Sequence, residues 1–292
     1  MFFLFALTGL FRLFENNLLS RWENAPALVV IIAFFIAWII FWLPIGFILT
    51  KLLHWTPEQP LQEQQKIPLI VSLYLLVPVT LFLTNLLTNQ SFADYGWIGN
   101  FSILYSLLLG FGWGVLSLVF VFGCQLYFGL CEFKLSNAKS VPSTLMSIML
   151  VALLVGAVEE LVFRGFLLTQ LEQTYSVWIG AIISSLIFAI LHLVWERQET
   201  VPQLPGLWLM GMVLVLARFA DNGSLGLAWG LHAGWVWSIA SIDTLNLVKY
   251  PDHNLDWITG KNKKPLAGVA GIFCMLLTAA VLYFAISTLN VA

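Results

Sequence analysis

The chain has 292 residues, of which 60% are hydrophobic and only 10% are charged, with a formal net charge of −2. A water-soluble domain could not bury so much apolar surface, so the composition predicts an integral, multi-pass membrane protein of the all-α class. No run of Lys and Arg alternates with aromatic residues, which excludes a nucleic-acid surface.

Residues 1–24 are expected to form an amphipathic helix in the membrane interface. No basic residue precedes the apolar run and a full span follows at once, so the segment does not fit a cleaved signal peptide. Polar residues interrupt apolar ones that recur every three or four positions, namely Phe3, Leu7, Leu10, Phe14 and Leu18. This pattern is typical of an interfacial helix rather than a span.

Residues 25–292 are expected to form one transmembrane helical bundle. A helix needs about 20 apolar residues to cross a bilayer, and polar loops rich in Pro, Gly and Asn separate stretches of that length. The sequence predicts about eight helices, at roughly 26–51, 67–88, 101–129, 142–171, 176–195, 204–220, 223–242 and 267–289.

Most of the basic residues fall on one side of the membrane if all eight helices span it. The other side carries Arg12, Arg21 and Arg218. Cytoplasmic loops are enriched in Lys and Arg, which predicts that both termini lie outside. The lysine-rich cytoplasmic side would then carry Lys51, Lys66, Lys134, Lys139, Arg197, Lys249, Lys261, Lys263 and Lys264.

Two adjacent carboxylates, Glu159 and Glu160, interrupt the fourth predicted helix. An ionised carboxylate at this depth costs about 2.5–3.5 kcal/mol on insertion scales, so the pair needs a partner or a function. Arg164 lies one helical turn beyond Glu160 and is the expected ion-pair partner. Glu159 points about 100° away and is expected to be the free group, a candidate general base that activates water.

Two histidines are candidates to join Glu159. Glu159 lies sixteen residues before the predicted turn near Tyr175 and His192 lies seventeen residues after it, so the two reach nearly the same depth. His232 lies in a later helix that is rich in small residues. An intramembrane His can also be a packing residue, and a Glu–Arg pair can be a staple between helices. The five ionisable groups together favour a reactive or transport site.

Three short motifs resemble those of the CPBP family of intramembrane proteases, which includes the CAAX prenyl endopeptidases and the bacterial Abi proteins. The resemblance covers about residues 142–241 and implies an eight-helix α-bundle. The motifs are EELVFR, with Glu159, Glu160 and Arg164; FAILH, with Phe188 and His192; and HAGWV, with His232.

The resemblance also implies roles. Glu159, assisted by His192, would activate water for attack on a peptide carbonyl, and His232 would help to stabilise the oxyanion. Glu160 and Arg164 would hold the position and charge of the base. Phe188, in the second motif, is the expected substrate-binding residue.

The third motif departs from the family pattern at Val236, where the family often has Asn. Valine cannot donate a hydrogen bond, and loss of one oxyanion donor costs about 10²–10³ in rate in a soluble protease. Ser238 points about 200° away from position 236, whereas an indole N–H of Trp235 or Trp237 is a candidate substitute.

No cofactor is expected. Zinc is an alternative, because a Glu and two His can bind it, but there is no HExxH motif and the three cysteines show no metal-ligand spacing. The CAAX endopeptidase resemblance implies a glutamate mechanism that requires no metal. The expected partners are the lipid bilayer and a membrane protein or lipidated peptide as substrate.

Three functions are consistent with this pattern. The first is an intramembrane endopeptidase that cuts a membrane-tethered, CAAX-like substrate. The second is a non-proteolytic member of the family that acts as a membrane scaffold or chaperone-like partner, which Val236 favours slightly. The third is a transporter with a proton relay, which the absence of paired broken helices in two related halves disfavours.

Overall fold

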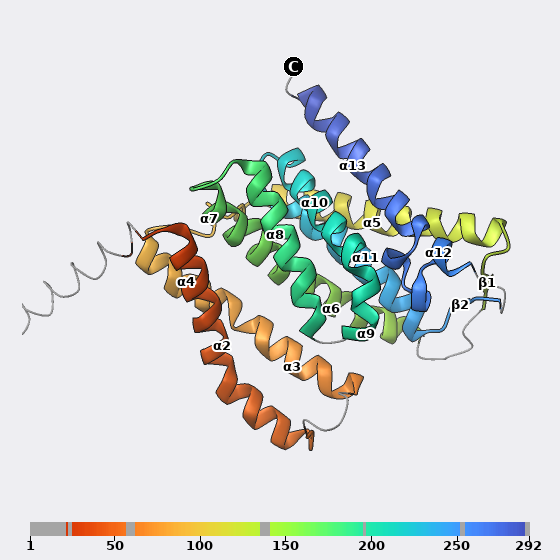
Figure 1. Cartoon of the computed structure of the whole chain (residues 1–292), viewed down its shortest axis with the longest axis horizontal. Helices are drawn as coiled ribbons and strands as arrows, with labels where there is room; N and C mark the ends of the chain where they lie inside the picture. The colour runs from red at the N-terminus through yellow and green to blue at the C-terminus, as the bar shows by residue number, and fades with distance from the viewer. Residues whose placement is uncertain are drawn as a thin grey trace, which may run out of the picture. The chain divides into compact units, whose positions relative to one another are not determined.

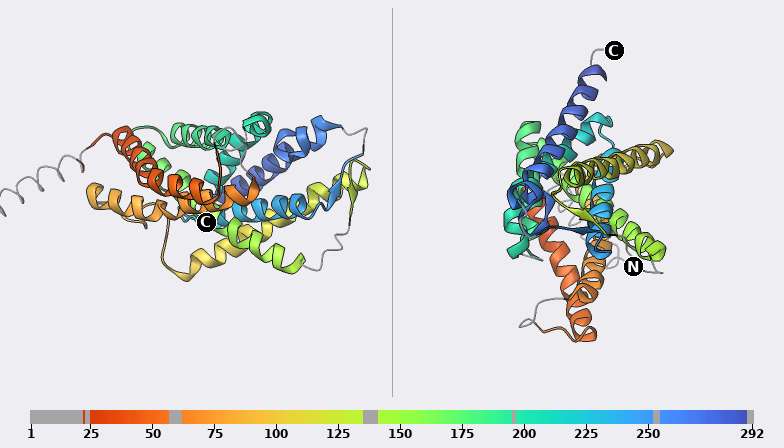
Figure 2. Two further views of the ribbon diagram at one scale, coloured as in Figure 1. Left: turned by 90° about the horizontal axis from the view of Figure 1, so that it is seen from below. Right: turned by 90° about the vertical axis from the view of Figure 1, so that its right-hand side faces the viewer.

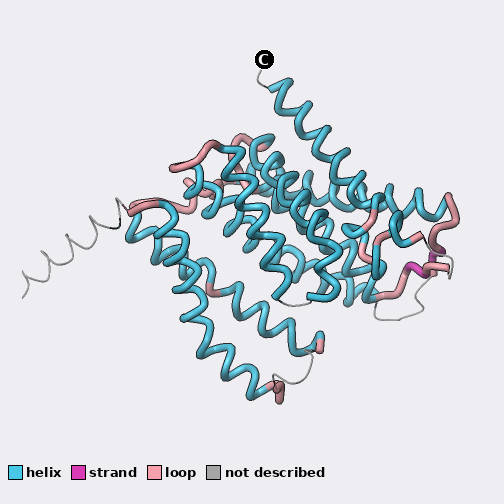
Figure 3. Tube along the Cα trace, viewed as in Figure 1, coloured by secondary structure: helices cyan, strands magenta, loops and turns pink. Residues whose placement is uncertain are grey.

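The computed structural model describes Trp22 and residues 25–56, 62–134, 141–194, 197–251 and 255–289. Apart from Trp22, the predicted interfacial helix at 1–24 lies outside these residues. Contacts between Cα atoms divide the chain into a first unit, Met1–Asp94, and a second unit, Tyr95–Ala292. Helices dominate both units (Figure 3), so the all-helical class is confirmed.

Helices occupy all eight predicted positions. Seven helical stretches in the described residues are long and apolar enough to cross a membrane, but α11 (Gly226–Thr244) is not among them. Glycine, histidine, tryptophan and serine lower its hydropathy. About half of its residues are buried by other helices, and a helix so enclosed does not need an apolar surface all round.

The first unit contains α2 (Ala27–Leu52), α3 (Glu63–Leu75) and α4 (Val77–Thr88). The span predicted at 67–88 is confirmed, because Gln64–Thr88 is long and apolar enough to cross a membrane, but the helix is interrupted at Leu76. Pro78, in the first turn of α4, has no N–H to continue the hydrogen bonding of α3. The indole of Trp38 donates to the Leu73 carbonyl at 2.8 Å and ties α2 to α3.

The second unit contains the long helices α5 (Phe101–Tyr127), α6 (Val141–Glu160), α8 (Val177–Leu191), α10 (Leu204–Ala220), α11 and α13 (Val269–Leu289). Shorter elements are β1 (Glu132–Phe133), α7 (Leu168–Glu172), α9 (Arg197–Thr200), β2 (Val248–Lys249) and α12 (Asp256–Thr259). Strands β1 and β2 pair antiparallel, with Glu132 opposite Lys249. Helix α13 extends beyond the other helices of this unit (Figures 1 and 2).

Helix α11 packs against α5, α6 and α10 (Figure 1). Its contact with α5 is made by main chain: a Cβ atom on Gly230 would lie 2.1 Å from the Leu107 carbonyl oxygen, and one on Gly110 would lie 2.4 Å from that of Leu227. Small residues permit such close approach of membrane helices. His232, two residues beyond Gly230, points roughly 200° away and so lies on the opposite face of α11.

Candidate functional site

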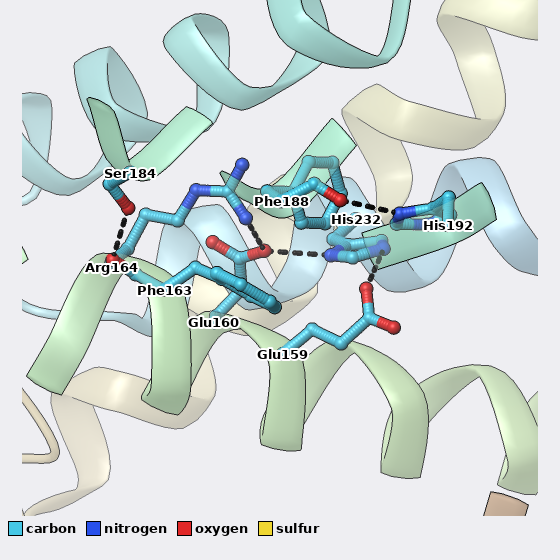
Figure 4. A network of polar contacts seen from close by, with 8 residues as sticks. All are labelled: Glu159, Glu160, Phe163, Arg164, Ser184, Phe188, His192 and His232. Carbon is cyan, nitrogen blue, oxygen red and sulfur yellow. Dashed lines mark hydrogen bonds and ion pairs between the residues drawn. The ribbon is translucent and has the colours of Figure 1, made fainter. Parts of the chain in front are cut away.

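Four ionisable side chains from two parts of the second unit meet in one cluster (Figure 4). Arg164 donates from Nη1 to Oε1 of Glu160 at 3.0 Å, and Nδ1 of His232 lies 2.7 Å from the same oxygen. Glu160 and Arg164 are both 0% exposed. The predicted Glu160–Arg164 ion pair is confirmed, and His232 is its third member.

Glu159 also contacts His232. Its Oε2 atom lies 3.5 Å from Nε2 of the imidazole, and the residue is 8% exposed. The expected division therefore holds for these contacts: Glu160 forms the ion pair with Arg164, and Glu159 faces one of the two candidate histidines. The two carboxylates do leave the helix in different directions, but one imidazole spans both because its two ring nitrogens face different ways (Figure 4).

The segment after the two glutamates, Leu161–Leu167, is a π-helix. Such turns are rare, occur often at functional sites and change the register of the backbone hydrogen bonds. Side chains from neighbouring helices donate hydrogen bonds to two successive main-chain carbonyls of this segment. The Ser184 hydroxyl donates to the carbonyl of Phe163 at 2.7 Å, and Nη1 of Arg218 donates to the carbonyl of Arg164.

Neither donor is among the site residues predicted from the sequence. Arg218 falls within the helix predicted at 204–220; it lies in the last turn of α10 and is 7% exposed. Its Nη2 atom also donates to Oγ1 of Thr169 at 3.2 Å. An arginine at the end of an apolar helix was the available signal, whereas Ser184 lies among apolar residues of α8 with no signal in the sequence.

Phe188 forms the packing centre of the site. Its ring lies 4.3 Å from Cζ of Arg164, a cation–π contact, and 4.6 Å and 5.9 Å from the rings of His192 and His232. The residue is 0% exposed, so the structure shows a ring covered by protein. Its contact with substrate stays a prediction.

His192 follows the last turn of α8. Its Nδ1 atom lies 2.8 Å from the carbonyl oxygen of Phe188 and must carry the hydrogen of that bond, because the carbonyl can only accept. A neutral ring then has a lone pair on Nε2. The predicted partnership of His192 with Glu159 stays a prediction, since the carboxylate's closest histidine contact given by the structure is His232.

A cavity of about 300 Å³ borders both histidines and Val236. Apart from the histidines, its wall is mainly apolar, and we call it the apolar cavity. The side chains that line it include Leu118, His192, Leu207, Met210, His232, Trp235, Val236, Ile239, Leu266 and Met275.

No side chain next to Val236 on α11 supplies the missing donor. Trp235 donates its indole N–H to Oγ of Ser117 at 2.9 Å, and Trp237 donates to the carbonyl of Leu145 at 3.0 Å. The expectation that one of these indoles replaces the missing donor is therefore wrong in this arrangement. The Ser238 hydroxyl donates to the main chain of its own helix, as its predicted direction suggested.

Within the described residues, no three His, Cys, Asp or Glu side chains gather as metal ligands. His232 has a carboxylate at each ring nitrogen, and Nδ1 of His192 is bonded to the main chain. The donors as arranged do not fit a zinc ion, and the expectation that no cofactor is required stays a prediction.

The cluster lies in a segment that is similar to a known protein family. Residues 141–238 match the family model described as type II CAAX prenyl endopeptidase Rce1-like. The predicted CPBP resemblance is therefore confirmed. We call residues 141–238 the Rce1-like region, and it contains all six predicted site residues.

A 94-residue stretch of the chain is 31% identical to an uncharacterized 24.3 kDa protein of Escherichia coli. The stretch is 32% of this chain and 42% of the relative, so the similarity spans less than half of either protein. No solved structure matches the chain.

Proposed function

We propose that the protein is an intramembrane endopeptidase that hydrolyses a peptide bond of a membrane-tethered, CAAX-like substrate with water activated by Glu159. The observation that carries the proposal is the contact of Glu159 with the imidazole of His232, a residue that lines an apolar cavity, within the Rce1-like region. A cavity of this size is at the lower end of the range of small-molecule sites and would suit the apolar group of a lipidated or membrane peptide.

The geometry of His232 constrains where a proton lies. With Nδ1–H donating to Glu160, Nε2 faces Glu159, and the contact of two acceptors is favourable only when one of them carries a proton. In the proposed reaction Glu159 accepts a proton from water as the water oxygen attacks the carbonyl carbon. The proton then passes to the leaving nitrogen when the C–N bond breaks.

The other residues would support this transfer. His192 lines the cavity, and the lone pair on Nε2 of its neutral ring would accept a hydrogen bond from the attacking water. His232 would stabilise the negative charge that develops on the carbonyl oxygen when it carries the shared proton. Glu160 and Arg164 would hold the imidazole in place, since both are enclosed and bonded to each other.

The test is turnover by Glu159→Gln in proteoliposomes. The substrates are prenylated and unprenylated membrane peptides, with products identified by mass spectrometry. Loss of a general base should lower kcat by about 10²–10⁴, while the amide keeps the shape of the side chain and the unfolding temperature stays close to that of the native protein. Turnover equal to the native rate would contradict the proposal.

A second function, that of a non-proteolytic membrane scaffold or chaperone-like partner, is favoured by one observation. Val236 lines the cavity, and the nearby donors on α11 are engaged elsewhere. In that case the native protein cuts none of the peptides, Glu159→Gln retains its partner in a pull-down from membranes, and Arg164→Met loses it because the cluster unfolds.

A further inference from the structure

One buried arginine of the second unit contacts both chain segments that build the site. Arg218 lies in the last turn of α10 and is 7% exposed. Each nitrogen of its guanidinium donates a hydrogen bond: Nη1 to the carbonyl of Arg164, Nη2 to Oγ1 of Thr169 at 3.2 Å, and Nε to the carbonyl of Gly223 at 3.2 Å. The first two acceptors follow the glutamate pair in the chain, and the third precedes α11.

The first acceptor, the carbonyl of Arg164, lies within the π-helix Leu161–Leu167. A π turn contains one residue more than an α turn, so it rotates the residues after it by about 100° relative to an unbroken α-helix. Before the π-helix, the two glutamates face the imidazole of His232. After it, Phe166 packs edge-to-face on Tyr95, with ring centroids 5.7 Å apart. The wider turn permits both sets of contacts, and one nitrogen of the guanidinium is bonded inside it.

The third acceptor, the carbonyl of Gly223, belongs to the turn that leads into α11. Gly223 has a φ of +86°, a left-handed backbone conformation that favours glycine. In the same turn, the carboxylate of Asp221 accepts from the N–H of Leu227 at 3.1 Å and from the hydroxyl of Ser106 at 2.7 Å. His232 lies five residues beyond Leu227, about 7.5 Å along the helix axis. A shift of this turn would therefore move the imidazole.

The shape of the guanidinium suits this set of acceptors. Its donors are fixed in one plane and point in different directions, whereas the ammonium of a lysine is a single point on a flexible stem. All three acceptors are neutral oxygens, and Glu172 in α7 supplies an electrostatic counter-charge. Replacement of Arg218 by lysine would keep the positive charge and lose the fixed geometry of the three bonds.

We propose that Arg218 is a positioning residue of the candidate site. It holds the π-helix after the glutamates against the turn that begins α11, and so sets the contact of His232 with both carboxylates. The consequence for catalysis rests on the proposed function. Arg218 is not among the residues that line the apolar cavity, so it acts on the reaction only through Glu159 and His232. Its loss should lower kcat and leave KM close to the native value, since misplacement of a catalytic group by about 1 Å can cost about 10² in rate.

The first test is turnover by Arg218→Met and Arg218→Lys in proteoliposomes, at a temperature at which circular dichroism shows the variant folded. Arg218→Met should lower kcat about 10²-fold, and Arg218→Lys should recover only part of the loss. Thr169→Val removes one of the three bonds and should have a smaller effect. If Arg218→Met does not fold, the other two variants carry the test. Arg197→Met, at an exposed arginine of α9, is the control and should keep the native kcat.

The second test is independent of turnover and observes His232 directly by NMR. The chain contains four histidines, so protein isotopically labelled in histidine alone gives few imidazole signals, and the signal lost in His232→Gln identifies this residue. Nδ1 of His232 lies 2.7 Å from Oε1 of Glu160, and the shifts of the ring nitrogens report which of them carries hydrogen. The signals of His232 should move in Arg218→Lys and stay in place in Arg197→Met.

Two outcomes would overturn the proposal. Unchanged His232 signals in the folded Arg218 variants would show that the arginine stabilises the fold without positioning the site. Native kcat in both Arg218 variants would also exclude a positioning role. Moved His232 signals in a protein that cuts no peptide, with Glu159 intact, would support the positioning of His232 and contradict the proposed function alone.

Discussion

Two ion clusters of the second unit have similar chemistry and different surroundings. The enclosed cluster joins Glu160, Arg164 and His232, of which the first two are 0% exposed. The rim cluster joins Lys264 to Glu199 and Asp243, whose side chains are 27%, 47% and 48% exposed. Each has one Lys or Arg side chain paired with at least one carboxylate, so their comparison shows how burial changes what an ion pair contributes.

Exposure to solvent determines how much each ion pair contributes to stability. At the rim, water and salt screen the attraction, and an exposed pair contributes about 0.2–1 kcal/mol. In the enclosed cluster the attraction is stronger, but each charge has lost its hydration, so the net gain of the pair is small while an unpaired member is costly. Removal of one partner should therefore lower the free energy of unfolding strongly in the enclosed cluster and only slightly in the rim cluster.

The largest effect is expected for Arg164→Met. Removal of the guanidinium leaves Glu160 buried with an uncompensated charge, which should lower the free energy of unfolding by about 3–5 kcal/mol. Unfolding in detergent, followed by circular dichroism, measures the loss. Glu160→Gln in the Arg164→Met background removes the orphaned charge and should restore part of the stability. A double variant no more stable than the single one would contradict this account.

A smaller loss is expected for Ser184→Ala, which leaves the π-helix carbonyl of Phe163 without its donor. A buried polar group without a hydrogen bond costs about 1–3 kcal/mol. Ser185→Ala is the matched control: Ser185 is equally buried, at 0% exposed, but its hydroxyl has no hydrogen-bond partner among the described residues. The same unfolding assay should show a loss for Ser184→Ala alone, and equal losses would refute a role for the carbonyl bond.

The positions of the helices and one ion pair of the site could be predicted from the sequence. Apolar length predicted the eight helical positions, and the four-residue spacing predicted the Glu160–Arg164 pair because both follow from local helix geometry. The role of His232 as a bridge did not follow. It depends on contacts between residues far apart in the chain, among them the close approach of Gly156 in α6 to Trp229 and Ala233 in α11. The π-helix after Glu160 and its donors Ser184 and Arg218 also depend on such contacts.

The break in the helix at Leu76 and the composition of α11 show the limit of apolar length as a signal. Pro78 was visible in the sequence, but whether a proline bends or ends a helix depends on its surroundings. The polar α11 was counted as a span because its length sufficed, although its burial by other helices explains its glycines and its histidine. The predicted orientation of the membrane loops depends on this helix and stays a prediction.

The smallest effect is expected for Lys264→Gln in the rim cluster. Screened by solvent, the two ion pairs should contribute no more than about 1 kcal/mol to stability, and the contribution should shrink at high salt. Unfolding temperatures at low and high salt measure both. Lys261→Gln, at a lysine outside the rim cluster, is the control and should show no salt-dependent difference from the native protein.

The pH dependence of Lys264 provides a second measurement of the same cluster. Burial lowers the pKa of Lys264, but Asp243 and Glu199 outweigh that effect and raise it above the usual value. A raised folded-state pKa means that the stabilisation is fully present below the unfolded value, about 10.4, and is lost as the pH rises through the folded value. The difference between the native protein and Lys264→Gln should therefore be constant at neutral pH and disappear only in alkaline solution. A difference that vanished near neutrality would show that the rim carboxylates do not hold this ammonium.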